Sequence, residues 1–181
     1  MGQIIITSFV SLDGVMEAPE KWSLPYWNDE IAEFKESELH ASDAQLLGTR
    51  TYEGFADAWP SRSGDYADRF NSQPKYVVSD SLETAEWNNS KIMRRNAYLP
   101  EEIQRLKSRH DGDILVHGSG TLAQWLLANR RADELRILLY PVVLGAGKRL
   151  LDKVGELALD LVQSRSMGSG VNLLTYRPQL A

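Results

Sequence analysis

The chain has 181 residues, of which 43% are hydrophobic and 25% charged, and its formal net charge is −5. This composition is ordinary for a globular protein with one core, and an acidic balance without a basic cluster argues against a nucleic-acid partner. Cysteine is absent and the three histidines are scattered, which argues against a disulfide framework or a metal site. We expect one domain over residues 1–181, cytoplasmic, with no targeting leader and no membrane span.

Apolar periodicity predicts alternating strands and helices along the first half of the chain. In order, the predicted elements are a strand at 3–10, a turn at 11–14, a helix at 29–41, a strand at 44–48, a helix stopped by Pro60, a helical turn at 66–70, strands at 75–79 and near Ile92, and a helix starting at Pro100. Asn28 is a suitable N-cap for the helix at 29–41, which has a narrow apolar stripe of Ile31, Phe34 and Leu39.

The loop at 17–27 carries three large aromatic residues, Trp22, Tyr26 and Trp27. Loops seldom hold so much aromatic surface unless it packs on the body of the protein or lines a pocket. We favour a pocket here, because Trp22 and Trp27 lie between the turn that follows the first strand and the next helix.

Residues 114–127 join a buried strand to a helix. Residues 114–116 are apolar and partly β-branched, as in a central strand, and Leu122, Trp125 and Leu126 have helical spacing. This is the arrangement in which a strand end and a helix N-terminus meet at one turn.

Gly118 and Gly120 bracket Ser119 in that turn. Backbone N–H groups and the positive end of a helix dipole would converge there, and the Ser119 and Thr121 hydroxyls could add donors for a phosphate. The same residues are also compatible with a simple turn in which Ser119 or Thr121 caps the helix.

The C-terminal third predicts mainly strands. They are an apolar strand region at 134–144 interrupted by Pro141, a basic loop at 145–149, and an antiparallel pair at 157–164 and 171–176. Strands that alternate with helices and are followed by strands alone favour an α/β fold with a mostly parallel sheet and an antiparallel edge.

Five short motifs lie at the predicted strand ends and cover nearly the whole chain. They are Ser11-Leu12-Asp13-Gly14, Leu47-Gly48-Thr49-Arg50-Thr51-Tyr52-Glu53, Lys75-Tyr76-Val77-Val78-Ser79, His117-Gly118-Ser119-Gly120-Thr121-Leu122 and Pro141-Val142-Val143-Leu144-Gly145-Ala146-Gly147-Lys148-Arg149-Leu150. In this order they resemble the dihydrofolate reductase superfamily, and more closely the branch containing the reductase domain of the bifunctional riboflavin-biosynthesis deaminase-reductase. The resemblance implies a dihydrofolate-reductase-like three-layer fold, with helices on both faces of the sheet.

The resemblance also implies that NADPH lies across the carboxyl ends of the strands. The residues it implicates are Gly118, Ser119, Gly120, Thr121 and Leu122 at the pyrophosphate, Thr49, Arg50 and Thr51 at the phosphates including the 2′-phosphate, Ser79 and Asp80 beside the adenine ribose, and Val10, Ser11 and Val15 beside the nicotinamide. Arg50 has the guanidinium that suits a phosphate, although a solvated surface arginine is its alternative interpretation.

Asp80 departs from the pattern of these relatives, which often carry a basic residue there. A carboxylate repels a 2′-phosphate but accepts a ribose hydroxyl. Either Asp80 points away from the cofactor, or the preference shifts toward NADH or is lost.

Reduction of a C=N or C=O group also needs a proton donor. By resemblance to the folate-reducing relatives, the acid would lie after the aromatic loop, where Asp29 is the nearest match; the alternative is that Asp29 only complements the helix dipole. Asp13 is the second candidate, and its alternative is an ordinary Asp-Gly turn. His117 is a candidate substrate contact with Trp22 and Trp27, and its alternative is a hydrogen-bonded structural histidine.

Two functions of different classes follow. The first is an NAD(P)H-dependent reductase of a small pterin- or pyrimidine-like molecule, including the 5-amino-6-(5-phosphoribosylamino)uracil reductase type that the resemblance implies. The second is a non-catalytic dinucleotide-binding module. A homodimer is expected for either, and the apolar residues 135–144 are the candidate interface.

Overall fold

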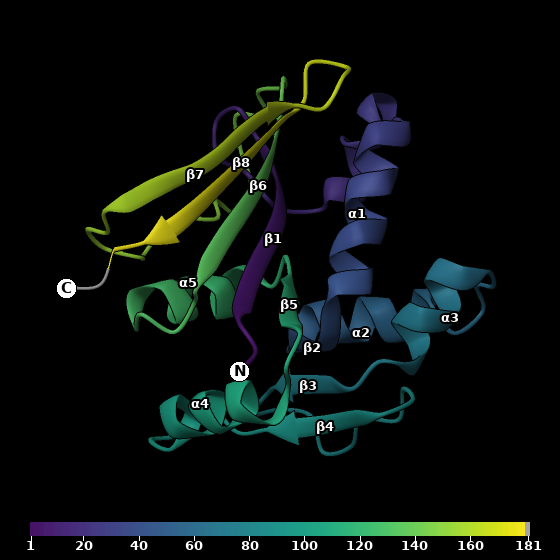
Figure 1. Ribbon diagram of the computed structural model, residues 1–181, viewed down its shortest axis with the longest axis vertical. Coiled ribbons are helices and arrows are strands. Elements are labelled where there is room, and N and C mark those ends of the chain that lie inside the picture. Colours follow the sequence, from purple (N-terminus) through teal and green to yellow (C-terminus); the bar gives the residue numbers. More distant parts are fainter. Residues whose placement is uncertain (180–181) are drawn as a thin grey trace.

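The computed structural model describes residues 1–179, so the last two residues of the predicted domain lie outside it. A single sheet of eight strands, in the order β4-β3-β2-β5-β1-β6-β8-β7, runs through the described chain (Figure 1). The strands are β1 (Ile4–Ser11), β2 (Ser42–Gly48), β3 (Lys75–Val78), β4 (Ser90–Met93), β5 (Asp113–His117), β6 (Glu134–Tyr140), β7 (Leu159–Ser166) and β8 (Asn172–Pro178). The helices are α1 (Asp29–Ala41), α2 (Thr49–Ala58), α3 (Asp65–Ser72), α4 (Leu99–Arg109) and α5 (Gly120–Ala128), with short 3₁₀ helices η1 (Pro19–Lys21) and η2 (Leu24–Tyr26).

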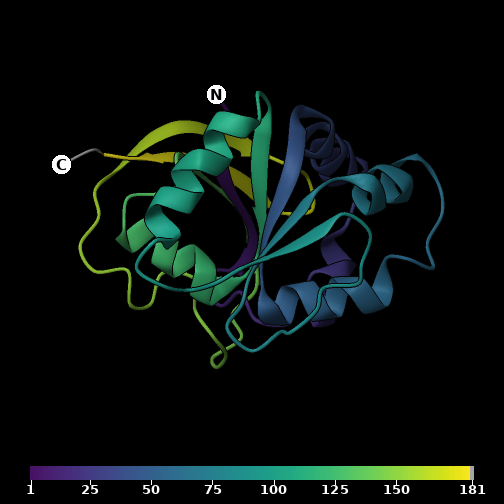
Figure 2. The ribbon, with the colours of Figure 1, turned by 90° about the horizontal axis from the view of Figure 1, so that it is seen from below.

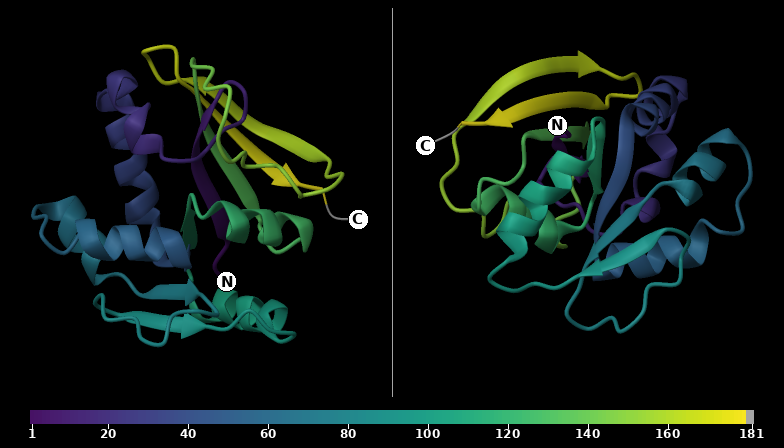
Figure 3. Two further views of the ribbon diagram at one scale, coloured as in Figure 1. Left: turned by 180° about the vertical axis from the view of Figure 1, so that it is seen from behind. Right: turned by 60° about the horizontal axis from the view of Figure 1, so that its bottom comes forward.

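The sheet has the mixed character that the sequence predicts. The first six strands pair in parallel, and β8 joins β6 and β7 in antiparallel pairing. The β7–β8 hairpin forms one edge and β4 the other (Figure 3). The predicted mostly parallel sheet with an antiparallel C-terminal edge is therefore confirmed.

Helices cover both faces of the sheet, with α4 and α5 on one side and α1, α2 and α3 on the other (Figure 2). The alternation of side chains along β1 explains this arrangement. Ile4, Ile6 and Val10 pack in the core beneath α4 and α5, whereas Thr7 and Phe9 face α1. The result is the expected three-layer fold.

The most visible departure from the sequence prediction concerns residues 134–144. The strand β6 ends at Tyr140, because Pro141 has no backbone N–H for the ladder, and the following residues form a loop that bonds to Leu12. The strand itself lies between β1 and β8, and Leu135 and Leu138 are fully covered within this chain. The homodimer stays a prediction, but Leu135, Ile137, Leu138 and Tyr140 of its candidate interface belong to the core of this chain.

The helices have between 8 residues (α3) and 13 residues (α1). Within residues 1–179, no helix combines the length and the apolar character that crossing a membrane requires. The predicted helical turn at 66–70 is a complete helix, α3, whose Phe70 is buried.

Phe70 is the centre of an aromatic cluster between α2, α3 and β3. Its ring lies 4.4 Å from Trp59, 5.5 Å from Phe55 and 5.8 Å from Trp87, centroid to centroid. Because the ring is 1% exposed, removing it leaves a cavity among rigid neighbours.

We therefore predict that Phe70→Ala lowers the free energy of unfolding by about 3–5 kcal/mol, measured by urea denaturation. The matched control is Tyr98→Ala, because Tyr98 is 70% exposed and its replacement should change stability by less than about 0.5 kcal/mol. Equal effects of the two substitutions would contradict this assignment of the core.

Candidate active site

Three strand ends meet at one edge of the sheet. Because β3, β2 and β5 are parallel neighbours, the residues that follow them emerge side by side. The Gly48 N–H donates to Ser119 Oγ over 3.0 Å, and Thr49 Oγ1 donates to Ser79 Oγ over 2.8 Å. The structure thus brings together three of the segments that the sequence selects for a cofactor.

Two helices begin at this point, one on each face of the sheet. The helix α2 starts at Thr49, directly after β2, and leads to β3 over one face. The helix α5 starts at Gly120, after β5, and leads toward β6 over the other face. Neighbouring strands whose connections leave in opposite directions create a crevice at their carboxyl ends, the usual ligand site of an open α/β sheet.

The glycine turn brings the backbone close to two other loops. Gly118 and Ser119 have φ angles of 54° and 52°, in the left-handed region. A Cβ on Gly120 would lie 2.6 Å from Met16 Sδ and 3.2 Å from Lys148 Cε, so only glycine fits there without displacement.

The hydroxyls of this turn are used differently from a simple helix cap. Ser119 accepts the Gly48 N–H and, within residues 1–179, makes no side-chain cap hydrogen bond to α5. Thr121 Oγ1 accepts a 2.6 Å hydrogen bond from Lys148 Nζ. The capping alternative is therefore wrong for Ser119, and the first N–H groups of α5 keep the orientation that binds anions.

Lys148 comes from the predicted basic loop, which is fixed to the N-terminal loop rather than solvated. Met16 N–H donates to Lys148 O over 2.9 Å, Lys148 N–H donates to Glu17 Oε2 over 3.1 Å, and Val15 forms a bridge with Arg149. A cation consequently lies at the start of α5, a placement that the sequence alone did not identify.

Two arginines that follow β4 contact Ser79 and Asp80, one through its side chain and the other through its backbone. Asp80 Oδ1 accepts the Arg95 backbone N–H over 2.9 Å, and Arg94 Nη1 donates to the Ser79 carbonyl over 2.9 Å. Both arginines follow β4, which pairs in parallel with β3. Arg50 is exposed in the first turn of α2, next to half-buried Thr51.

The residues predicted beside the nicotinamide are enclosed in this structure. Val10, Ser11 and Val15 are 5%, 0% and 1% exposed. The Ser11 hydroxyl accepts the Val15 N–H and donates to Asp13 Oδ1. Leu122 is likewise buried beneath the sheet, so contact of these four side chains with a cofactor stays a prediction.

Asp13 holds two loops together. Its carboxylate accepts hydrogen bonds from the Ser11 hydroxyl over 2.6 Å, the Leu144 N–H over 3.1 Å and the Gly145 N–H over 2.8 Å. The Ser11 hydrogen bond, followed by the Leu144 N–H, lowers the pKa of Asp13 to about 2. An acid that stays ionised at neutral pH does not serve as the proton donor, so this geometry favours the turn alternative for Asp13.

Asp29 lies exposed in the first turn of α1. The preceding Asn28 caps the helix by accepting the Ile31 N–H over 3.1 Å. This location fits the helix-dipole alternative, and a catalytic role for Asp29 stays a prediction.

The aromatic loop mostly packs on the body of the protein. Trp22 and Tyr26 meet the buried ring of Tyr140 edge-on, at centroid distances of 5.4 and 5.8 Å. Trp27 is 45% exposed and lies 6.2 Å from Phe9. A contact of Trp22 or Trp27 with the substrate stays a prediction.

The helix α1 carries a buried ion pair beside Thr7 of β1, and sequence reasoning missed it. Lys35 Nζ donates to Glu38 Oε2 over 2.6 Å and to Thr7 Oγ1 over 3.0 Å. Lys35 and Glu38 are 9% and 2% exposed. Their positions, four and seven residues after buried Ile31, place them on the inner face of the helix, which is the signal that could have revealed them.

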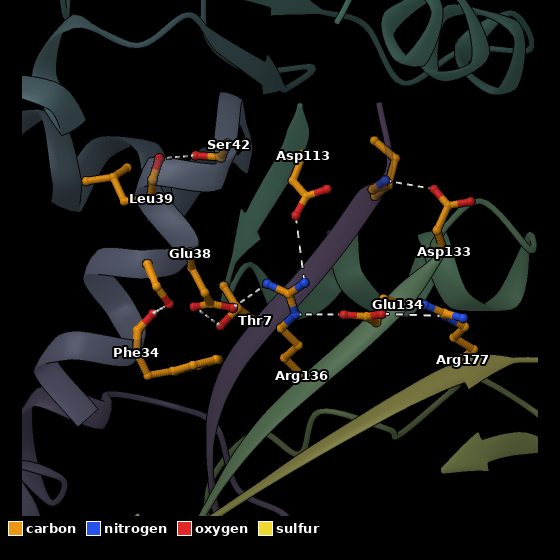
Figure 4. Close-up of polar contacts among 12 residues, drawn as sticks. Thr7, Phe34, Glu38, Leu39, Ser42, Asp113, Asp133, Glu134, Arg136 and Arg177 are labelled. Atoms are coloured by element: carbon orange, nitrogen blue, oxygen red, sulfur yellow. Dashed lines mark hydrogen bonds and ion pairs between the residues drawn. The ribbon is translucent and has the colours of Figure 1, made fainter. Parts of the chain in front are cut away.

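Glu38 extends this pair into a chain of alternating charges across the sheet (Figure 4). Its second oxygen, Oε1, accepts from Arg136 Nη1 over 3.2 Å, and Arg136 Nε donates to Glu134 Oε1 over 2.7 Å. Burial opposes the charge of Arg136, but Glu38 and Glu134 outweigh it and raise its pKa. Burial raises the pKa of Asp113, 3.7 Å from Arg136, although Arg136 pulls that pKa down.

His117 lies on the same row of the sheet as Thr7. It is 8% exposed, its ring is 5.4 Å from Phe70 and 6.1 Å from Phe55, and among the described residues no polar atom bonds its buried Nε2. Burial, assisted by the Lys35 charge, holds the pKa of His117 well below its ordinary value. The imidazole is therefore neutral at pH 7, and a contact of His117 with the substrate stays a prediction.

A groove of about 460 Å³ lies between α1 and the strands β6, β7 and β8. It exposes parts of Phe34, Glu38, Arg136 and Val162. None of the residues predicted to hold the cofactor lines it, so we do not assign the reaction to this groove.

Comparison with known proteins agrees with this geometry. Residues 3–173 match the sequence profile of the RibD C-terminal domain. The chain is 27% identical to the Uncharacterized protein YyaP of Bacillus subtilis (strain 168), over 96% of this chain and 94% of that one.

Two solved structures share the fold. A Shewanella sp. PV-4 protein provisionally assigned to riboflavin biosynthesis superposes with a TM-score of 0.80, at 18% identity, over 98% of this chain and 99% of that chain. The dihydrofolate reductase of Enterococcus faecalis, in complex with NADP(H) and RAB-propyl, gives 0.62 at 17% identity, over 99% of this chain and 98% of that chain. These likenesses confirm the dihydrofolate-reductase-like fold.

The hydrogen bonds of Asp13 generate a pH prediction. Because the pKa of Asp13 is lowered from 3.8 to about 2 by folding, its ionised form stabilises the folded state. That contribution is complete above about pH 4 and is lost as the pH falls through about 2. We predict that Asp13→Asn destabilises the protein at pH 6, and that the difference from the wild type shrinks between pH 5 and pH 3.

Urea unfolding at each pH measures this difference. The Asp152→Asn variant, at a carboxyl exposed on the surface, controls for the general effect of one lost charge. A difference that stays constant or grows toward pH 3 would refute the role given to Asp13.

Proposed function

This chain belongs to the RibD C-terminal domain family, and from that premise we propose that it is an NAD(P)H-dependent reductase of a small pterin- or pyrimidine-like heterocycle. The reaction of the 5-amino-6-(5-phosphoribosylamino)uracil reductase type is the narrowest form of this proposal. The nicotinamide cofactor, when bound, supplies the hydride. The protein binds and orients both molecules.

One observation carries the proposal: the helices α2 and α5 begin side by side at the carboxyl ends of β2 and β5. Each N-terminus presents N–H groups with no partner inside the helix and the positive end of its dipole. The hydrogen bond between Gly48 and Ser119 joins the two starts. Two such N-termini and the ammonium of Lys148 suit a diphosphate better than any other part of the described chain.

Basic residues beside this crevice support a preference for NADPH. Arg50 is the second residue of α2, the Arg94 guanidinium donates to the Ser79 carbonyl, and the Arg95 backbone N–H donates to Asp80. A guanidinium can bind a 2′-phosphate with two hydrogen bonds. The Asp80 carboxylate is held by a backbone N–H, which weakens the case for NADH that the sequence raised.

The competing proposal is a dinucleotide-binding module without reductive chemistry. The observation in its favour is that neither predicted acid is a buried carboxyl, since Asp13 is held ionised and Asp29 is exposed. Steady oxidation of NADPH in the presence of dihydropterin or amino-uracil compounds decides between the two. Turnover supports the reductase, and binding without turnover supports the module.

A charge at the start of α5 tests the cofactor site. Thr121→Glu adds a carboxylate that the helix dipole favours but that repels a diphosphate, so we predict that it weakens NADPH binding about tenfold, or roughly 1.4 kcal/mol. Thr121→Gln has the same size without the charge and should change affinity less than about threefold. Fluorescence titration of NADPH measures both, and wild-type affinity in Thr121→Glu would contradict the site.

Arg50 tests the choice between cofactors. We predict that Arg50→Ala lowers NADPH affinity about tenfold, because a charge-assisted hydrogen bond to the 2′-phosphate is lost, and changes NADH affinity by less than about threefold. Arg105→Ala is the control, since Arg105 is exposed on α4. Equal losses for NADPH and NADH would refute a contact with the 2′-phosphate.

A further inference from the structure

The ammonium of Lys35 has a hydrogen-bonding capacity that its known partners do not use up. A lysine ammonium carries three N–H donors, and those of Lys35 bond Glu38 Oε2 and Thr7 Oγ1. Lys35 Nζ also lies 5.8 Å from the centroid of the Phe9 ring. Among residues 1–179 the third N–H has no acceptor, and the ammonium lies in a region that is almost closed to water.

This region adjoins the glycine turn of the candidate active site. Gly118 N–H donates to the Thr7 carbonyl over 3.1 Å, and His117 precedes Gly118 on the same row of the sheet as Thr7. The Nε2 of His117 is buried and has no bonding partner in the part of the chain that the structure describes. Two neighbouring polar groups, an ammonium beside Thr7 in the middle of β1 and a neutral imidazole at the end of β5, thus have hydrogen-bonding capacity that the described residues do not use.

Glu38 and Arg136 fix the ammonium in place. One carboxylate oxygen of Glu38 accepts hydrogen bonds from Lys35 Nζ and from the Thr7 hydroxyl. The other oxygen accepts from Arg136, and Figure 4 shows the contacts of Glu38 with Thr7 and Arg136. A flexible lysine held by a buried carboxylate loses its rotamer freedom during folding rather than during binding, which favours recognition of a ligand.

We propose that Lys35 binds the substrate, by donating a hydrogen bond to a ring oxygen of an oxo-heterocycle, and that Glu38 is its positioning residue. This inference rests on the proposed reductase function and adds the group that recognises the substrate. A buried ammonium donates to a carbonyl oxygen of the ligand. It disfavours an amino group at the same ring position, because two donors cannot form a hydrogen bond with each other.

A purely structural ion pair is the competing explanation. Buried ion pairs often contribute little net stability, and an apolar pair of similar size would serve as well. The structural explanation does not account for His117 Nε2, which is unpaired among the described residues. It also does not explain why His117 directly precedes the glycine turn of the candidate active site. It also predicts no ligand preference, which makes the two explanations distinguishable.

The test uses three pteridines that differ only at two ring positions: pteridine-2,4-dione, 2-amino-4-oxopteridine and 2,4-diaminopteridine. Their binding to the full chain is measured by fluorescence titration, with and without saturating NADPH. We expect the wild type to bind the dione at least tenfold more tightly than the diamine, and Lys35→Met to reduce this ratio to below threefold.

Two further variants keep the test decisive. Lys35→Met leaves the Glu38 carboxylate unpaired and could impair folding, so Lys35→Met combined with Glu38→Gln removes both charges and should show the same loss of preference. Lys91→Met, at an exposed lysine of β4, should keep the wild-type ratio.

The outcomes distinguish a failure of the role of Lys35 from a failure of the proposed reductase function. A wild type that prefers the diamine, that binds none of the three, or whose ratio survives both Lys35 variants overturns the role of Lys35. Absence of NADPH binding in the parallel titration overturns the proposed function instead, because the pteridine ratio is also measured on the cofactor-free protein.

Discussion

The parallel pairing of β3, β2 and β5 is the constraint on which the rest of the structure depends. It places the ends of these strands at one edge, and the opposite directions of the following helices open a crevice there. Two short hydrogen bonds, from Gly48 to Ser119 and from Thr49 to Ser79, hold the edge together. Every residue that we assign to the diphosphate lies within this arrangement except Lys148, which reaches Thr121 from the loop at 145–149.

A second constraint lies where α1 packs on β1 and β6. It is a chain of alternating charges from Lys35 through Glu38 to Arg136 and Glu134. Such buried groups are expensive to leave unpaired, so the chain fixes α1 against the sheet. The helix α1 therefore contacts the core through its apolar residues and Thr7 through its polar residues, at the place where we propose that the substrate binds.

Much of the fold was predictable from the sequence because the apolar periodicity of each element, and the capping and turn residues that bound it, are local properties. Asn28 and the apolar stripe gave α1 its bounds, and the β-branched runs and glycines located β5 and α5. The contacts of the site were less predictable because they join distant segments. Asp13 meets Gly145, and Asp80 meets Arg95, only after the strands have paired. Lys35 and Glu38 were overlooked because polar residues on a helix are ordinarily expected in solvent, although their spacing from Ile31 placed them inside.

The central claim is that the two helix N-termini at Gly48 and Ser119 hold the diphosphate of a dinucleotide. A crystal structure of the protein soaked with NADP⁺ tests it most directly. The account predicts phosphate density within hydrogen-bond distance of the first N–H groups of α5, with the adenine end toward Ser79. Clear density for the nucleotide elsewhere, or an unchanged crevice at saturating concentration, would contradict it.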